Sequence, residues 1–299
     1  MDEVLPAQRR LPVWATFRRS YGYVWEYRAL FAAPILIVFV ATLAGNLVVG
    51  AIMPAPDDLA ATQPGAAAIV VSALFRIAIG ILGMSVAVGV HRTVLLDEVR
   101  SGFAFLRGDR HLWSYFKTTV LLLLIYLLLL LGLAAIVGIV GFAVAAFTQG
   151  TGMDMPAAAR IGFALLVAGM VAVGALVFLR LALALPAAAL GDGRWLELSW
   201  RATRHNALRL FAASALVFLP WAATILLVEL AVVSAFAGFT FETEAMPPGL
   251  RLLTLVVQAA ASAIAVPVFT VMLSLSYDVL VRGGGPQRAR PGAEGVTPP

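Results

Sequence analysis

The sequence predicts an all-α integral membrane protein, a polytopic bundle of six transmembrane helices. Of its 299 residues, 62% are hydrophobic and only 12% are charged, and the mean hydropathy is +0.96. Soluble globular domains are about 45–50% apolar and about 25% charged. So few charges cannot cover a water-facing surface of this size, and the chain therefore requires lipid as its solvent.

Six apolar runs are each long enough to cross the roughly 30 Å of hydrocarbon in a bilayer, which takes about 20 helical residues. A single helix satisfies its own backbone hydrogen bonds in lipid, so runs of this kind predict helices. The first run is too long for a cleaved signal sequence, so we expect it to remain as a span. The expected spans are 29–51, 67–90, 118–147, 159–185, 208–238 and 250–281.

The basic residues predict the orientation. Lys and Arg gather on the cytoplasmic side of membrane proteins. Seventeen of the 21 lie in four segments on one predicted side, whereas only Arg160 and Arg251 lie in the connections on the other. We therefore expect both termini in the cytoplasm. The preference for Arg and Ala, with Lys117 as the only lysine, favours a bacterial source and hence the inner membrane.

The spans recur with a period of about 90 residues, which predicts three helical hairpins. LFAAPILIV at 30–38 also matches LFAASALVF at 210–218. Each unit begins with an aromatic and basic segment, for which we expect a cytoplasmic interfacial helix near 12–28, 105–117 and 194–206. The prediction is a single membrane domain over 1–282, with repeats at about 10–93, 104–185 and 192–282. The Gly- and Pro-rich tail at 283–299 is expected to be disordered.

The interfacial segments are expected to contact lipid headgroups. Trp prefers the headgroup region of a bilayer, and Arg and Lys there attract anionic lipid. An ordinary amphipathic connector that fixes helix ends is the simpler interpretation of the same pattern, beside a dedicated lipid or partner sensor. The expected lipid-contacting residues are Trp14, Arg18, Arg19, Trp25, Trp113, Lys117, Trp195, Trp200, Arg201 and Arg204.

Two segments resemble a known group of bacterial membrane proteins. They are LALALPAAALGDGRWLELSWRATRHNALRLFAASALVF at 181–218 and HRTVLLDE at 91–98. They are similar to the YciC-like family and to the membrane domain that accompanies some glycerophosphodiester phosphodiesterases. The resemblance implies a six-span inner-membrane protein. It implies no phosphodiesterase activity, because that activity belongs to a separate soluble barrel for which these segments leave no length.

Residues that would carry catalysis or hold a metal form no recognisable pattern. There are no cysteines, and the three histidines, at 91, 111 and 205, have no zinc-binding spacing. We expect them near the headgroups. Asp97 and Glu98 are adjacent, so a helix would point them apart, and they are interpreted as cytoplasmic surface. The sequence therefore predicts no catalytic residues, no metal site and no cofactor.

Four polar residues interrupt the apolar runs at similar depths: Asn46, Arg76, Glu229 and Gln258. A single charge in hydrocarbon costs roughly 2.5–3.5 kcal/mol on insertion scales. Arg76 and Glu229 are therefore expected to pair. The pair either fixes the register of two helices or lines a path for a solute or proton.

The favoured function is a non-enzymatic inner-membrane scaffold or accessory factor. Its expected partners are membrane lipids with anionic headgroups and a membrane protein, with no nucleic acid. The alternative is a small-solute transporter or lipid-handling protein that uses the Arg76–Glu229 region. An enzyme acting on lipid at the cytoplasmic interface is a third hypothesis.

Overall fold

The described part of the computed structural model is almost entirely helical. It covers residues 10–52, 66–98, 105, 108–151, 157–236 and 248–284. Its helices are α1 (Val13–Glu26), α2 (Arg28–Ile52), α3 (Ala66–Leu96), α4 (Arg110–Thr151), α5 (Ala157–Ala182), α6 (Ala184–Leu190), α7 (Trp195–Thr203), α8 (Ala207–Phe236) and α9 (Pro248–Tyr277). A π-helical turn at Asp278–Arg282 extends α9.

Six of these helical segments are long and apolar enough to cross a membrane, which confirms the predicted number of spans. They are Arg28–Ala51, Ala66–Leu96, Arg110–Ala146, Ile161–Leu190, Ala207–Val228 and Leu252–Arg282. No strand occurs among the residues that the structure describes. The predicted tail can be followed only to Gly284, so its expected disorder lies outside the described residues.

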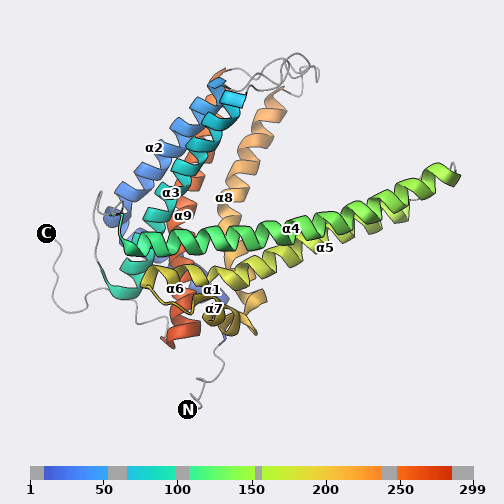
Figure 1. The fold of residues 1–299 in the computed structure, drawn as a ribbon. Helices are drawn as coiled ribbons and strands as arrows, with labels where there is room; N and C mark the ends of the chain where they lie inside the picture. The colour runs from blue at the N-terminus through green and yellow to red at the C-terminus, as the bar shows by residue number, and fades with distance from the viewer. Residues whose placement is uncertain are drawn as a thin grey trace, which may run out of the picture.

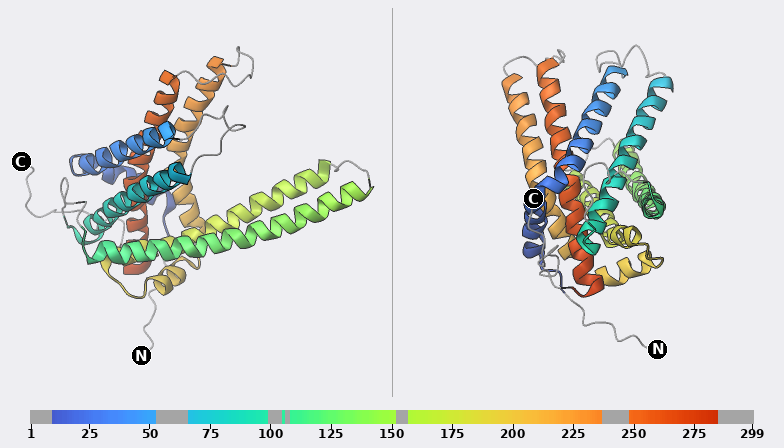
Figure 2. Two further views of the ribbon diagram at one scale, coloured as in Figure 1. Left: turned by 45° about the horizontal axis from the view of Figure 1, so that its top comes forward. Right: turned by 90° about the vertical axis from the view of Figure 1, so that its left-hand side faces the viewer.

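The spans form two arms rather than one parallel bundle. In the first arm α9 is central and packs against α1, α2, α3 and α8. In the second arm α4 and α5 pair with each other and project sideways (Figures 1 and 2). Near the junction, α4 packs against α3 and α6, while α5 packs against α7 and α8.

The densest core lies in the half of α9 that leads to the π turn. Val268, Val271 and Met272 are almost completely buried there, together with Phe31 of α2 and Leu210 of α8. The hydroxyls of the buried serines at 274 and 276 donate to the backbone one turn earlier, to Thr270 O and Met272 O. Their polar atoms therefore have partners inside their own helix, so helices can pack closely around α9.

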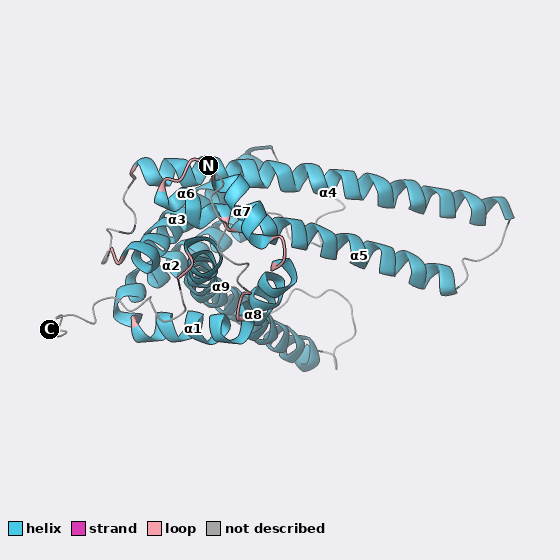
Figure 3. Cartoon of the chain, turned by 90° about the horizontal axis from the view of Figure 1, so that it is seen from below, coloured by secondary structure: helices cyan, strands magenta, loops and turns pink. Residues whose placement is uncertain are grey.

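Short helices cover one end of the first arm. Figure 3 shows α1 along one side of this end and α6 and α7 on the opposite side, with α9 between them. Pro186 has no N–H, and its ring clashes with the carbonyl of Ala182, which explains why α5 ends there and α6 begins anew. Gly191 then ends α6 with a φ of 83°, a left-handed conformation that glycine adopts without strain.

The predicted middle interfacial helix is not a separate element. The segments near 12–28 and 194–206 do contain distinct helices, α1 and α7. The middle segment instead runs from Arg110 directly into the span as the first turns of α4. Residues 110–131 contain no Pro or Gly, and the helix runs through them without interruption. The three units are therefore not alike in this feature, and the threefold repeat stays a prediction.

Candidate functional site

Most of the predicted lipid-contacting side chains are exposed. Exposure reaches 73% for Trp25 and 57% for Trp113, large values for tryptophan. Arg19 and Trp195 are instead half-buried. The exposed members of the set are Trp14, Arg18, Trp25, Trp113, Lys117, Trp200, Arg201 and Arg204.

Three of these exposed tryptophans each have a cation over the ring. The distances from charged group to ring centroid are 5.5 Å for Arg28 on Trp25 and 5.3 Å for Lys117 on Trp113. The third pair is Arg180 on Trp200, at 3.7 Å. Such pairs are attractive because the face of the indole ring is electron-rich. They come from α4 and from the short helices and helix ends that cover the first arm, and we call them the capped tryptophans.

Arg180 also fastens α5 to α7. Its backbone carbonyl accepts hydrogen bonds from the hydroxyls of Ser199, at 2.6 Å, and Thr203, at 3.2 Å. Its guanidinium donates to Trp200 O at 3.3 Å. The expected span 159–185 contains Arg180, but the sequence analysis did not predict this role. The only available signal was Pro186, which ends the helix early enough to leave Arg180 in its last turn.

Contacts over almost 200 residues of sequence attach the N-terminal segment to α8. The amide of Leu11 donates to Asn206 Oδ1 at 2.9 Å, and Arg209 donates to Leu11 O at 3.2 Å. Further along, the Tyr21 hydroxyl donates to Val217 O at 2.8 Å, and burial raises the pKa of that phenol. Helix α1 is therefore held against α8 just before its first residue and again at Tyr21.

The HRTVLLDE segment closes α3 by folding back on itself. Asp97 takes a φ of 57°, which reverses the chain and brings Glu98 back to Arg92. Glu98 receives two hydrogen bonds from the Arg92 guanidinium, one of them Nε to Oε2 at 2.8 Å. Arg92 also donates to Ala189 O of α6 at 3.2 Å. Asp97 and Glu98 were interpreted as cytoplasmic surface; Asp97 is exposed and Glu98 is half-buried, and the arginine with which Glu98 pairs joins α3 to α6.

The expectation for the histidines is wrong at position 91. His91 is completely buried, and its Nδ1 lies 2.7 Å from Ser274 Oγ of α9. Its ring also lies 5.8 Å from that of Tyr115 of α4. His111 is half-buried and His205 is exposed. No group of three His, Cys, Asp or Glu side chains that could hold a metal occurs within the described ranges.

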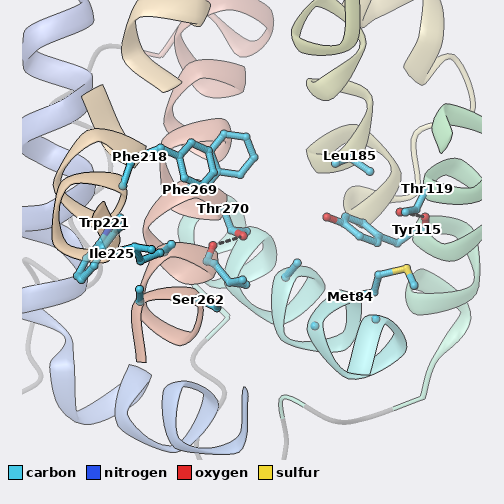
Figure 4. A pocket seen from close by; sticks show the side chains of 17 residues that line it. Met84, Tyr115, Thr119, Leu185, Phe218, Trp221, Ile225, Ser262, Phe269 and Thr270 are labelled. Carbon is cyan, nitrogen blue, oxygen red and sulfur yellow. Dashed lines mark hydrogen bonds between the residues drawn. The ribbon is translucent and has the colours of Figure 1, made fainter. Parts of the chain in front are cut away.

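An apolar cavity of about 570 Å³ lies where the two arms diverge. Figure 4 shows Phe218, Phe269 and Trp221 on one side and Met84 and Leu185 on the other. The walls come from α3, α4, α6, α8 and α9. The full lining is Gly80, Gly83, Met84, Ala87, Tyr115, Thr119, Leu185, Phe218, Trp221, Ala222, Ile225, Ala261, Ser262, Ala265, Val266, Phe269 and Thr270. We call this the junction cavity.

The three polar span residues whose side chains the structure describes are not gathered around this cavity. Asn46 and Gln258 are half-buried on α2 and α9, which pack together. Arg76 is exposed on α3. Glu229 belongs to α8, but its side chain lies outside the described residues. Asn46, Arg76 and Gln258 do not line the junction cavity. The Arg76–Glu229 pair therefore stays a prediction.

A double substitution tests that pair. Removing one member of a buried ion pair costs about 3–5 kcal/mol, whereas replacing both by apolar residues can be nearly neutral. If the pair exists, Arg76→Leu and Glu229→Leu each lower the melting temperature in detergent, and the double variant regains much of the loss. Additive losses in the double variant, measured by thermal unfolding, would show that the two side chains do not interact.

Six apolar helices together with these exposed tryptophans define the class of the molecule: it is a multi-pass integral membrane protein. No family model, no curated protein and no solved structure matches the chain. The resemblance to the YciC-like proteins and to the phosphodiesterase membrane domain accordingly remains a proposal.

Proposed function

We propose that the chain is a non-enzymatic scaffold or accessory factor of the bacterial inner membrane, related to the six-span proteins that it resembles. Its partners are anionic membrane lipids and a membrane protein. The capped tryptophans carry this proposal. Each places an indole and a cation together at an exposed position, which suits the boundary between acyl chains and anionic headgroups.

The polar contacts near the end of the first arm that α1, α6 and α7 cover support a structural role. Arg92, Arg180 and Arg209 are each used to join separate segments of the chain. Interactions of this kind stabilise the ends of helices, and the three arginine side chains already have partners within the protein. An end fixed in this way holds the capped tryptophans in a constant arrangement for lipid and partner.

The orientation that this proposal needs has both termini in the cytoplasm. A reporter fused after Pro299 is expected to show cytoplasmic activity, and one inserted at Gln63 to show periplasmic activity. The physical reason is the excess of basic residues on one side of the spans. Activity of the opposite kind at the two positions would reverse the assignment and would place the capped tryptophans outside the cytoplasm.

The lipid part of the proposal is tested by neutralising exposed arginines. A triple variant with Arg18, Arg201 and Arg204 changed to Gln is expected to co-purify several-fold less anionic phospholipid than the wild type, with zwitterionic lipid unchanged. Each basic residue near an anionic surface contributes about 1 kcal/mol. Arg160→Gln, predicted on the other side, is the control. Equal loss in the control would contradict a specific interfacial role.

The scaffold part is tested by crosslinking in native membranes followed by purification. We expect one membrane protein at fixed stoichiometry with the chain. Recovery of the chain alone, with lipid, would reject the scaffold role.

The transporter alternative requires a water path to Arg76. A cysteine introduced at position 76 would react with a membrane-impermeant thiol reagent only if that path exists.

A further inference from the structure

We propose that the junction cavity is a lipid site that holds one acyl chain of a membrane phospholipid, with the Tyr115 hydroxyl directed to the ester end of that chain. The inference goes beyond the scaffold role and does not depend on it. It rests on four observations: the chemistry of the lining, the small residues that create the space, the place of Tyr115 and the membrane-spanning walls.

The lining is mostly apolar in composition, and the hydroxyls of its two threonines are already hydrogen-bonded. The Thr119 hydroxyl donates to Tyr115 O at 2.9 Å, and the Thr270 hydroxyl donates to Val266 O at 2.7 Å (Figure 4). Because both hydroxyls bond to their own helices, these threonines add few polar groups to the walls. A stable water needs two to four polar partners. A space of about 570 Å³ with such walls does not hold a column of water.

The space exists because small residues line part of it. On α3 the wall contains Gly80 and Gly83, and a Cβ added at either position meets no atom within 4 Å. The opposite wall on α9 contributes Ala261 and Ala265. Side chains that face the gap lose dispersion attraction because no atoms lie opposite them. A flexible hydrocarbon chain that fills the gap restores this attraction.

Tyr115 supplies a polar group at a defined place. Figure 4 shows its hydroxyl pointing from α4 into the cavity, towards α9. Tyr115 belongs to the second turn of α4, close to the end of the molecule that carries Trp113 and Lys117. A phospholipid whose headgroup lies near that end places its ester within the reach of this phenol, and the phenol then donates to the ester carbonyl.

The location of the walls within the membrane determines which kind of molecule can enter the cavity. All five contributing helices, α3, α4, α6, α8 and α9, lie within the membrane-spanning segments, so the surrounding solvent is the acyl chains of the bilayer. Acyl chains are present at high concentration and need no aqueous route. Since the bilayer is as apolar as the cavity, affinity comes from packing and from the single hydrogen bond rather than from leaving water.

The experiment uses the full-length protein in vesicles of phosphatidylglycerol and phosphatidylethanolamine, with a trace of phosphatidylglycerol carrying a diazirine in one acyl chain. After photolysis, labelled residues are located by mass spectrometry. Labelling of Met84, Ile225 and Phe269 is expected to exceed that of Ile139 and Phe142, exposed residues of α4, by about tenfold.

Filling the cavity should remove this preference. Gly83→Phe places a ring in the open space and is expected to reduce labelling of the three cavity residues to the level of Ile139. Gly138→Phe, at an exposed glycine of α4 with equally open surroundings, is the control and should change nothing. Tyr115→Phe should lower cavity labelling several-fold without abolishing it.

Two results would overturn the proposal. One is equal labelling of cavity and exposed residues in the wild type, which is decisive even if Gly83→Phe does not fold. The other is a crosslink from the cavity residues to a second copy or another protein in place of lipid, which would identify the cavity as a protein-binding site.

Discussion

Gly89→Ala is expected to destabilise the protein by about 1–2 kcal/mol, although alanine is the better helix former. A Cβ at Gly89 would lie too close to Phe105, whose nearest ring carbons are within 3 Å of that position. The ring cannot yield easily, because Phe105 is completely buried and its carbonyl accepts a hydrogen bond from Ser85 at 2.7 Å. Overpacking of this kind costs about 1–3 kcal/mol, which exceeds the gain of up to about 1 kcal/mol from helix propensity.

The same substitution at Gly80 provides the matched control on the same helix. Nothing lies within 4 Å of a Cβ there, so Gly80→Ala should leave the melting temperature unchanged or raise it. Thermal unfolding in one detergent measures both. Phe105→Leu should relieve most of the cost of Gly89→Ala. Equal stability of the two alanine variants would mean that Phe105 does not pack on α3 as described.

Glu98→Gln is expected to lower the free energy of unfolding by about 1–3 kcal/mol. It removes the charge that pairs with Arg92, whose side chain is only 11% exposed. Loss of one member of a fully buried pair costs about 3–5 kcal/mol. The Glu98 side chain is 38% exposed, so solvent screens part of that interaction and the expected cost is smaller.

The pair Glu197–Arg201 provides the comparison. It joins residues four apart on α7 at 2.9 Å, with side chains 56% and 57% exposed. Exposed helical pairs contribute about 0.3–0.5 kcal/mol, so Glu197→Gln should lie close to wild type in the same melting experiment. If Glu98→Gln were equally mild, the junction of α3 with α6 would have to depend on other contacts.

The spans were predictable because apolarity along a run is a local property of the sequence. Helix α1 was predictable for a related reason, since Trp14, Phe17 and Tyr21 recur at helical spacing. The middle segment shared the same composition, yet it became part of α4. Composition identifies an interfacial segment but does not say where a helix ends: α1 ends at Glu26 and α7 at Thr203 with no Pro or Gly at either boundary, whereas the helix through 110–131 is continuous.

The contacts between segments were not predictable from the pattern. The Arg92–Glu98 pair requires the reversal at Asp97, whose φ of 57° is rare for a residue other than glycine. His91 is polar and stands at the end of a span, so the sequence placed it near headgroups. Its burial depends on Ser274, which is 183 residues away. The junction cavity likewise exists only between helices whose arrangement no single segment encodes.

The sideways course of the α4–α5 hairpin has a consequence for the bilayer around it. The candidate span Arg110–Ala146 of α4, which includes the basic residues of its first turns, contains 37 residues, which at 1.5 Å per residue is about 55 Å of helix. That in α2 contains 24, or about 36 Å. If the spans in α4 and α2 both stood upright, they would require membranes of very different thickness. A helix of about 55 Å fits about 30 Å of hydrocarbon only when steeply tilted, and it then reaches roughly 45 Å along the membrane plane. The sideways course of the hairpin relative to the other spans is the arrangement expected if both lengths share one bilayer, and it gives the protein a lateral footprint wider than six parallel helices would occupy.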